Sequence, residues 1–184
     1  MSMQLDKVQP KNKTQLKQLI NYAFKHNIYD LNFIDTSEIT DMSLLFSNCM
    51  HNFDVSNWDV SNVTNMGCTF YKCNMFTGKG LENWDVSNVT NMYRMFTWCK
   101  IFNRDLSNWD VSNVTDMTSM FAFCNTFDCD LSNWDVSNVT GMYFMFGRCK
   151  QFNCDLSHWN VSKIKNMKCM FKGCNRLTIP NWYK

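Results

Sequence analysis

An internal repeat of about 25 residues constrains this chain more than any other feature. The segment NWDVSNVT occurs four times unchanged, beginning at Asn57, Asn83, Asn108 and Asn133, and a degraded copy begins at His158. In each copy the Trp is followed at fixed distances by a Met, a Phe and a Cys. These landmarks are Trp58, Trp84, Trp109, Trp134 and Trp159; Met66, Met92, Met117, Met142 and Met167; Phe70, Phe96, Phe121, Phe146 and Phe171; and Cys73, Cys99, Cys124, Cys149 and Cys174. Repetition at this period is typical of arrays in which each unit buries its apolar face against the next.

Two spacings within one coil predict its secondary structure. Residues 106–111 follow the spacing L-x-x-L-x-L, in which a short strand points alternate side chains inward. Residues 117–124 place Met, Met, Phe and Cys at i, i+3, i+4 and i+7, one face of a two-turn helix, and Thr115 is its candidate N-cap. The prediction is an α/β solenoid: a right-handed, leucine-rich-repeat-like stack of about six strand-plus-short-helix coils with the landmarks in internal columns.

The two ends of the chain depart from the repeat. Residues 14–24 place apolar side chains at helical spacing after Thr14, a candidate N-cap, and predict a capping helix. At the other end the last coil is basic, and Pro180 is expected to stop further strand pairing. The predicted organisation is a capping helix and lead-in over 1–30, a repeat solenoid over 31–176 and an end segment over 177–184.

The cysteines are predicted to be structural. Six of the ten, Cys49, Cys73, Cys99, Cys124, Cys149 and Cys174, recur at one position of the coil, where a thiol acts as a small buried hydrophobe. Pairs such as Cys68 and Cys73 lie at the loose edge of zinc-ligand spacing. Residues five apart on the predicted helix lie about 140° apart, so the pair would not converge on one ion. Metal binding is therefore only an alternative, and no metal or cofactor is predicted.

The repeat also carries a family resemblance. The phrase DLSNWDVSNVT followed by M-x-x-M-F-x-x-C resembles the 26-residue bacterial surface protein repeat of the BspA-like leucine-rich-repeat surface proteins, over about residues 31 to 176. The resemblance implies a leucine-rich-repeat-like solenoid, a role in adhesion or host-protein binding, and no catalytic residues.

Composition and motifs exclude several classes of function. None of the three histidines lies in a constellation that positions a Ser or Cys nucleophile, so the protein is not expected to be an enzyme. A net charge of +2 gives no argument for nucleic acid, and no apolar window is long enough for a membrane span. The polar start lacks the apolar core of a secretory signal, and the thiols favour a reducing compartment. The resemblance instead favours the cell surface, so the compartment stays open.

One column of aspartates admits two interpretations. Asp59, Asp85, Asp110 and Asp135 lie between inward-facing Trp and Val and are expected to face outward. Stacked carboxylates about 4.8 Å apart repel one another, so something must compensate. The column could bind cations or basic groups of a partner. The favoured interpretation is local: each carboxylate accepts hydrogen bonds from nearby backbone N–H, Ser or Asn groups.

Positions that differ between coils are the better candidates for a specific site. Aromatic and arginine side chains lie beside the apolar stripe in three successive coils, as protein interfaces prefer, although these rings could also fold over the core edge. The candidate partner-binding residues are Tyr93, Arg94, Trp98, Phe123, Tyr143, Phe144 and Arg148, together with Asn108, Asp110, Asn133 and Asp135 on the strand face. The predicted function is a protein-binding repeat module, an adhesin or host-interaction protein. A structural, weakly self-associating element is the first alternative and a metal-binding protein the second.

Overall fold

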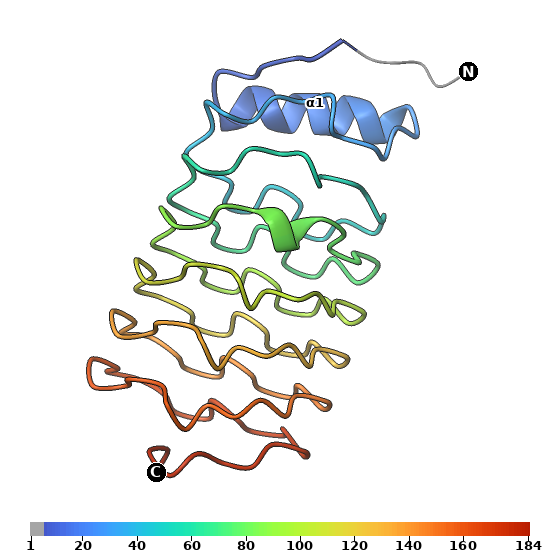
Figure 1. The fold of residues 1–184 in the computed structure, drawn as a ribbon. Helices are drawn as coiled ribbons and strands as arrows, with labels where there is room; N and C mark the ends of the chain where they lie inside the picture. Colours follow the sequence, from blue (N-terminus) through green and yellow to red (C-terminus); the bar gives the residue numbers. More distant parts are fainter. Residues whose placement is uncertain (1–5) are drawn as a thin grey trace.

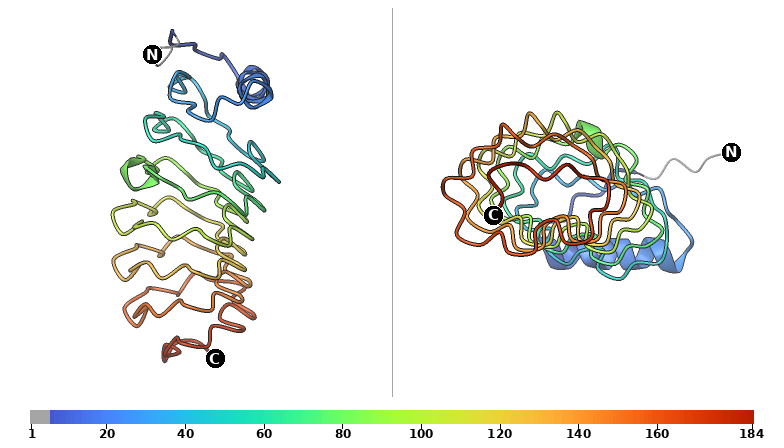
Figure 2. Two further views of the ribbon diagram at one scale, coloured as in Figure 1. Left: turned by 90° about the vertical axis from the view of Figure 1, so that its right-hand side faces the viewer. Right: turned by 90° about the horizontal axis from the view of Figure 1, so that it is seen from below.

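The chain folds as a stack of coils that consist almost entirely of turns. The computed structural model describes residues 6–184. Within that range the helices are the α-helix α1, Lys13–Lys25, and the 3-10 helix η1, Leu81–Asn83. Figure 1 shows the coils following one another below α1, and Figure 2 shows them superposed when the stack is viewed along its axis. Isolated parallel β-bridges, such as Asp116 with Gly141, join neighbouring coils, and residues 6–184 contain no extended strands.

The predicted α/β solenoid of strand-plus-helix coils is therefore wrong, and with it the description as a leucine-rich repeat. Residues 106–111 form no strand, and residues 117–124 form a series of turns. In those turns Ser119 and Phe123 have φ of 56° and 64°, which a continuous right-handed helix cannot contain. Thr115 caps no helix; its hydroxyl donates to the carbonyl of Thr90 in the preceding coil, at 3.1 Å.

Main-chain hydrogen bonds between coils run in one direction along the turns of residues 117–123. Within the turns the N–H of Met120 donates to the carbonyl of Met117, at 3.1 Å. The alternate N–H groups instead donate to carbonyls of the following coil: Met117 to Gly141 at 2.9 Å, Ser119 to Tyr143 at 2.9 Å, Phe121 to Met145 at 2.9 Å and Phe123 to Gly147 at 2.8 Å. In these turns each coil thus offers N–H donors towards the C-terminal end and carbonyl acceptors towards the N-terminal end. Just before the turns the direction is reversed, because the N–H of Thr115 donates to the carbonyl of Thr90 in the preceding coil at 2.8 Å.

The predicted internal columns are confirmed. Phe121 is buried and stacks on Phe96 and Phe146 of the adjacent coils, with ring centroids 5.7 Å apart in both pairs. The indole N–H of Trp109 donates to the carbonyl of Leu81 at 2.8 Å, and the Cys124 thiol donates to the carbonyl of Phe96 at 3.0 Å. Each of these carbonyls also accepts a main-chain N–H of its own coil, so the buried Trp and Cys side chains add a second hydrogen bond that joins neighbouring coils.

Helix α1 covers the N-terminal end of the stack, as the apolar spacing predicted. It packs Leu16, Ile20 and Ala23 against the core, and Figure 1 shows it lying over the first coils. The N-cap is Asn12 and not Thr14: the Asn12 side chain accepts the N–H of Gln15 at 3.0 Å. The helix is 13 residues long. No helix within residues 6–184 is long and apolar enough to cross a membrane.

The extra residue between Trp58 and Trp84 is accommodated at η1. Gly80 precedes this turn with φ of 86°, and a Cβ there would lie 2.1 Å from the Cβ of Ser56. The position requires glycine both for its backbone conformation and for the close approach of the preceding coil.

The column of tryptophans extends into the end segment. Trp182 donates its indole N–H to the carbonyl of Leu156 at 2.8 Å, as each earlier Trp does to the coil before it. Tyr183 packs edge-on against Phe171, with centroids 5.0 Å apart. Pro180 is buried, and its carbonyl accepts the N–H of Tyr183 at 3.0 Å. Residues 177–184 therefore begin the pattern of a further coil, which the sequence reasoning missed because the spacing falls to 23 residues.

Candidate functional site

The structure brings together the aromatic and arginine residues singled out by their variation between coils. Trp98 and Phe123 stack with centroids 4.0 Å apart and planes 7° from parallel, and Phe144 continues the row 5.7 Å from Phe123. These three rings are half-buried, and Tyr143 is exposed beside Phe144. We call this surface the aromatic patch; it consists of Tyr93, Arg94, Trp98, Lys100, Phe123, Tyr143, Phe144 and Arg148.

The apices of the turns position most of these side chains. Arg94, Trp98, Phe123, Phe144 and Arg148 all have φ between 53° and 67°, in the left-handed region. At these positions the side chain points away from the inward Met and Phe columns. Residues with quite different side chains have the same conformation in the other coils, namely Leu44, Asn48, Cys68, Lys72, Ser119 and Cys169. The strain therefore belongs to the repeat, and only the aromatic and basic side chains distinguish the patch.

Cations lie over the rings of the aromatic patch. Lys100 Nζ is 5.6 Å from the centre of Trp98, and the Arg148 guanidinium carbon is 5.6 Å from the centre of Phe123. Arg94 lies 5.1 Å from the centre of Tyr93 in the same way. Such contacts hold long side chains against the rings and are worth about 0.5–1 kcal/mol at exposed sites. The patch thus offers flat apolar surface framed by positive charge and contains no acidic side chain.

The four polar candidates of the predicted strand face do not join this patch. All four are exposed and flank the column Trp of their coils, on what we call the Trp side: Asn108, Asp110, Asn133 and Asp135. Asp110 accepts the N–H of Ser112 at 3.0 Å, and Asp135 accepts that of Ser137 at 2.9 Å. The local interpretation of the aspartate column is confirmed.

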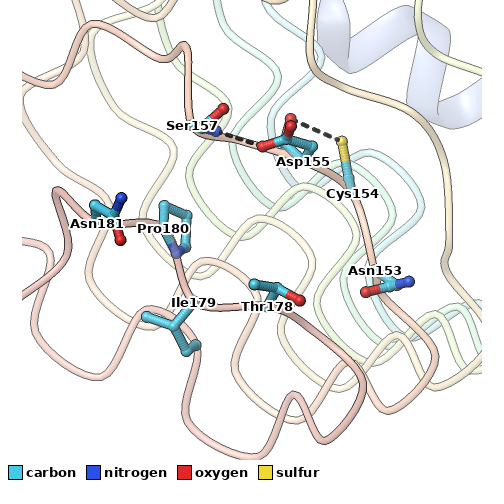
Figure 3. Close-up of a pocket in the computed structure, with 8 residues that line it drawn as sticks. All are labelled: Asn153, Cys154, Asp155, Ser157, Thr178, Ile179, Pro180 and Asn181. Atoms are coloured by element: carbon cyan, nitrogen blue, oxygen red, sulfur yellow. Dashed lines mark hydrogen bonds between the residues drawn. The ribbon is translucent and has the colours of Figure 1, made fainter.

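A second surface, which the sequence reasoning missed, is a shallow acidic groove along one edge of the stack. Its walls carry Asp105, Asp128, Asp130 and Asp155 from successive coils. Figure 3 shows its last part, a hollow of about 420 Å³ near the C-terminal end. That part is lined by Asn153, Cys154, Asp155, Ser157, Thr178, Ile179, Pro180 and Asn181.

The two cysteines of the acidic groove connect coils and are not activated. Cys129 Sγ accepts the N–H of Leu106, and Cys154 Sγ accepts that of Leu131, both at 3.1 Å. Burial raises the pKa of Cys129 to about 11 and that of Cys154 to about 12. Both are therefore protonated thiols at neutral pH, not the thiolates that nucleophilic or metal chemistry requires. Within residues 6–184 no three His, Cys, Asp or Glu side chains converge as metal ligands.

The carboxylates of the acidic groove accept hydrogen bonds within their own turns. The backbone and side chain of Ser132 hydrogen-bond to Asp130 and lower the pKa of that carboxyl, and Ser107 acts in the same way on Asp105. The Cys154 thiol donates to Asp130 at 3.4 Å. The repeated sequence "DLS" could have predicted a column of aspartates, but the groove exists only because the coils stack in register.

Native-state labelling tests the burial of the cysteines. Seven of the ten are buried, and only Cys49, Cys68 and Cys169 are partly exposed. We expect a maleimide added to the reduced, folded protein to modify these three at least about tenfold faster than the others, because thiolate formation and access are both suppressed by burial. Mass spectrometry of peptides quenched over time measures each site. Equal rates for Cys124 and Cys169 would contradict the buried column, and a sample in denaturant provides the control in which all ten react.

Geometry alone defines the class: a repeat protein whose turn-rich coils stack around aromatic columns, with two surfaces that differ in charge. The sequence profile of one family, described as Mycoplasma protein of unknown function, DUF285, matches residues 13–112 and 68–182. The chain therefore belongs to the DUF285 family. No curated protein and no solved structure matches the chain.

Proposed function

We propose that this protein is a protein-binding repeat module and that the aromatic patch contacts its partner. The observation that carries the proposal is the row formed by Trp98, Phe123 and Phe144, which lies outside the core and is flanked by cations. The core columns need none of these rings, because other coils place Leu, Lys or Ser at the same positions.

The chemistry of the patch resembles that of interface hot spots. Trp, Tyr and Arg are enriched among residues whose truncation weakens binding by about 2 kcal/mol or more. Rigid rings also lose little conformational entropy when a partner covers them. The similarity of the repeat to that of BspA-like surface proteins adds support for a partner on a host cell or in an adhesive layer. No catalytic step and no cofactor forms part of the proposal.

Capture experiments with paired variants test this assignment. The reduced wild-type protein, immobilised, is used to collect partners from host and bacterial lysates, and the capture is repeated with Trp98→Ala. We expect the signal of a specific partner to fall about tenfold or more, because a central ring worth about 2 kcal/mol is lost.

The matched control is Asp110→Ala, on the Trp side of the coil and outside the patch. We expect it to retain capture within about twofold, since its carboxylate serves its own turn. Equal capture by wild type and Trp98→Ala, with both folded by circular dichroism, would remove the aromatic patch as the site. Loss with Asp110→Ala alone would move the site to the opposite side of the coil.

A further inference from the structure

A continuous column of side chains runs through the aromatic patch from one coil to the next. Equivalent turn apices of four successive coils carry Lys72, Trp98, Phe123 and Arg148, all with positive φ. Phe123 therefore has a neighbour on each face: the Trp98 indole stacks on one, with centroids 4.0 Å apart, and the Arg148 guanidinium lies over the other at 5.6 Å. Lys100 Nζ lies over Trp98, also at 5.6 Å. The exposed parts of Trp98 and Phe123 are therefore mainly ring edges.

The sequence leaves room for the ring of Phe144. Gly147 lies in the same turn, and a Cβ there would lie 2.4 Å from atoms of the Phe144 ring. The equivalent position has a side chain in the three preceding coils: Tyr71, Thr97 and Ala122. The repeat itself therefore does not require glycine at this position. The Phe144 ring lies against the main chain of its own turn, with its centre 5.7 Å from that of Phe123.

The cations of the aromatic patch have no carboxylate partner. The ion pairs within residues 6–184 both lie elsewhere: Lys13 with Asp41, and Lys79 with Asp54. Arg94, Lys100 and Arg148 are exposed. Their charges are therefore free to attract an anionic ligand.

Positive and negative charge are separated within the coils that carry the patch. The turn segments 91–100, 116–125 and 141–150 contain four basic residues and one acidic residue: Arg94, Lys100, Arg148, Lys150 and Asp116. The carboxylate of Asp116 accepts the N–H of Thr118 in its own turn, at 2.8 Å. The segments between these turns, 101–115 and 126–140, contain five Asp and one Arg. An anionic ligand is thus attracted to the turns and repelled by the rest of each coil.

The covered ring faces limit the kind of ligand that the patch can recognise. Nucleic-acid bases bind by stacking on free aromatic faces, whereas Trp98 and Phe123 are stacked on each other and lie under cations. The edge of an aromatic ring is the positive side of its quadrupole, so exposed edges favour negative groups. A guanidinium group and a carboxylate form two parallel hydrogen bonds. Carboxylates on a chain that also presents apolar side chains to the rings therefore fit this surface.

We propose that the partner of the aromatic patch is an acidic segment of another polypeptide, with apolar side chains between its carboxylates. This inference rests on the proposed function and names the chemistry of the partner. The carboxylates of the segment pair with Arg94 and Arg148. Its apolar side chains cover the exposed parts of Trp98, Phe123 and Phe144.

Selection from a random peptide library tests this chemistry without assuming a sequence. Short peptides displayed on phage are depleted on the variant Trp98→Ala and then selected on the immobilised, reduced full chain. We expect Asp and Glu to be enriched about twofold or more over the unselected library, because complementary charge favours association with the patch.

Variants of protein and peptide then identify the groups that pair. Binding of the most enriched peptide, made synthetically, is measured by fluorescence anisotropy. We expect the double variant Arg94→Gln, Arg148→Gln to weaken binding about tenfold or more, and replacement of the peptide's Asp and Glu by Asn and Gln to have the same effect. The matched control Lys163→Gln, Lys165→Gln removes two exposed charges outside the patch, and we expect it to change Kd less than about twofold. Unchanged thermal unfolding shows that both variants remain folded.

Three outcomes would overturn the proposal. The first is a selection that yields no peptide dependent on Trp98, or only peptides without acidic residues. The second is a heparin fragment of similar charge that binds through Arg94 and Arg148 more tightly than the peptide, which would assign the patch to anionic glycans. The third is self-association in sedimentation that is lost both in Trp98→Ala and in the acidic-groove variant Asp130→Asn, Asp155→Asn, which would make a second copy the partner.

Failure of this inference is distinguishable from failure of the proposed function. If capture from lysates depends on Trp98 while the selected peptides lack acidic residues, the patch remains a protein-binding site and only the chemistry of its partner is wrong. Capture that does not depend on Trp98 overturns both.

Discussion

Replacement of Trp109 with alanine is expected to lower the free energy of unfolding by about 3–5 kcal/mol, the range for removal of a large buried ring. Trp109 is 4% exposed and lies against Phe96, with centroids 6.2 Å apart. Its indole N–H also satisfies the carbonyl of Leu81 at 2.8 Å. The variant therefore loses packing in the aromatic core and one of the two donors to this carbonyl, which keeps the N–H of Trp84 at 3.1 Å. Urea unfolding followed by circular dichroism measures the change.

Two further variants separate the contributions of ring and hydrogen bond. Trp109→Phe retains an aromatic ring but not the donor, and we expect it to cost about 0.5–1.5 kcal/mol for the lost hydrogen bond, because the carbonyl of Leu81 keeps the N–H of Trp84. Trp98→Ala removes a half-buried ring from the aromatic patch, and we expect a loss below about 1 kcal/mol. A loss below about 1 kcal/mol for Trp109→Ala would contradict the inference that the buried Trp column stabilises the fold.

The sequence predicts the interior of this protein well because the interior is what the repeat preserves. Identical residues at fixed spacing must occupy equivalent places in successive coils, which predicts the Trp, Phe and Cys columns whatever the backbone does between them. The same reasoning identified α1 from its apolar spacing. It also located the aromatic patch, because residues that vary between coils are free of the packing that fixes the others.

The backbone of the coil could not be predicted in the same way. Spacing at i, i+3, i+4 and i+7 places side chains inward on a helix, but a series of four-residue turns places them inward too. The signal that usually distinguishes turns is glycine at positions with positive φ. Here Ser119 and Phe123 occupy those positions, with φ of 56° and 64°. The sequence therefore lacks the glycines that would have indicated the turns. Bonds to the next coil hold these residues in a conformation they rarely adopt alone.

The acidic groove depends on relations between coils rather than on any motif. Asp105, Asp130 and Asp155 are ordinary turn residues in sequence and form a wall only when stacked. This surface therefore required the three-dimensional register.

The stability of the fold is expected to fall steeply in alkaline solution because of the cysteine column. Cys73, Cys99, Cys124 and Cys149 are each 0% exposed. Burial raises the pKa of Cys73 to about 12 and holds the pKa values of the other three well above the usual range. In the unfolded chain a thiol ionises near pH 8.5, roughly. Above that pH the unfolded chain loses protons that the folded chain keeps, so stability decreases as pH rises.

The expected size of this effect follows from the four thiols together. About one pH unit above the unfolded pKa, each contributes a loss of roughly 1.4 kcal/mol, so the four remove roughly 5–6 kcal/mol, comparable to the whole stability of many domains. Urea unfolding under reducing conditions at about pH 7.5 and about pH 9.5, below the usual pKa values of Lys and Tyr, measures it. The thiols of Cys129, Cys154 and Cys174, whose pKa values burial also raises, add to the loss in the wild type. The control is the double variant Cys99→Ala, Cys124→Ala, whose pH-dependent loss should be smaller than that of the wild type by roughly 3 kcal/mol. An unfolding free energy that stays constant between the two pH values would show that the column thiols ionise as readily in the folded protein as in the unfolded chain.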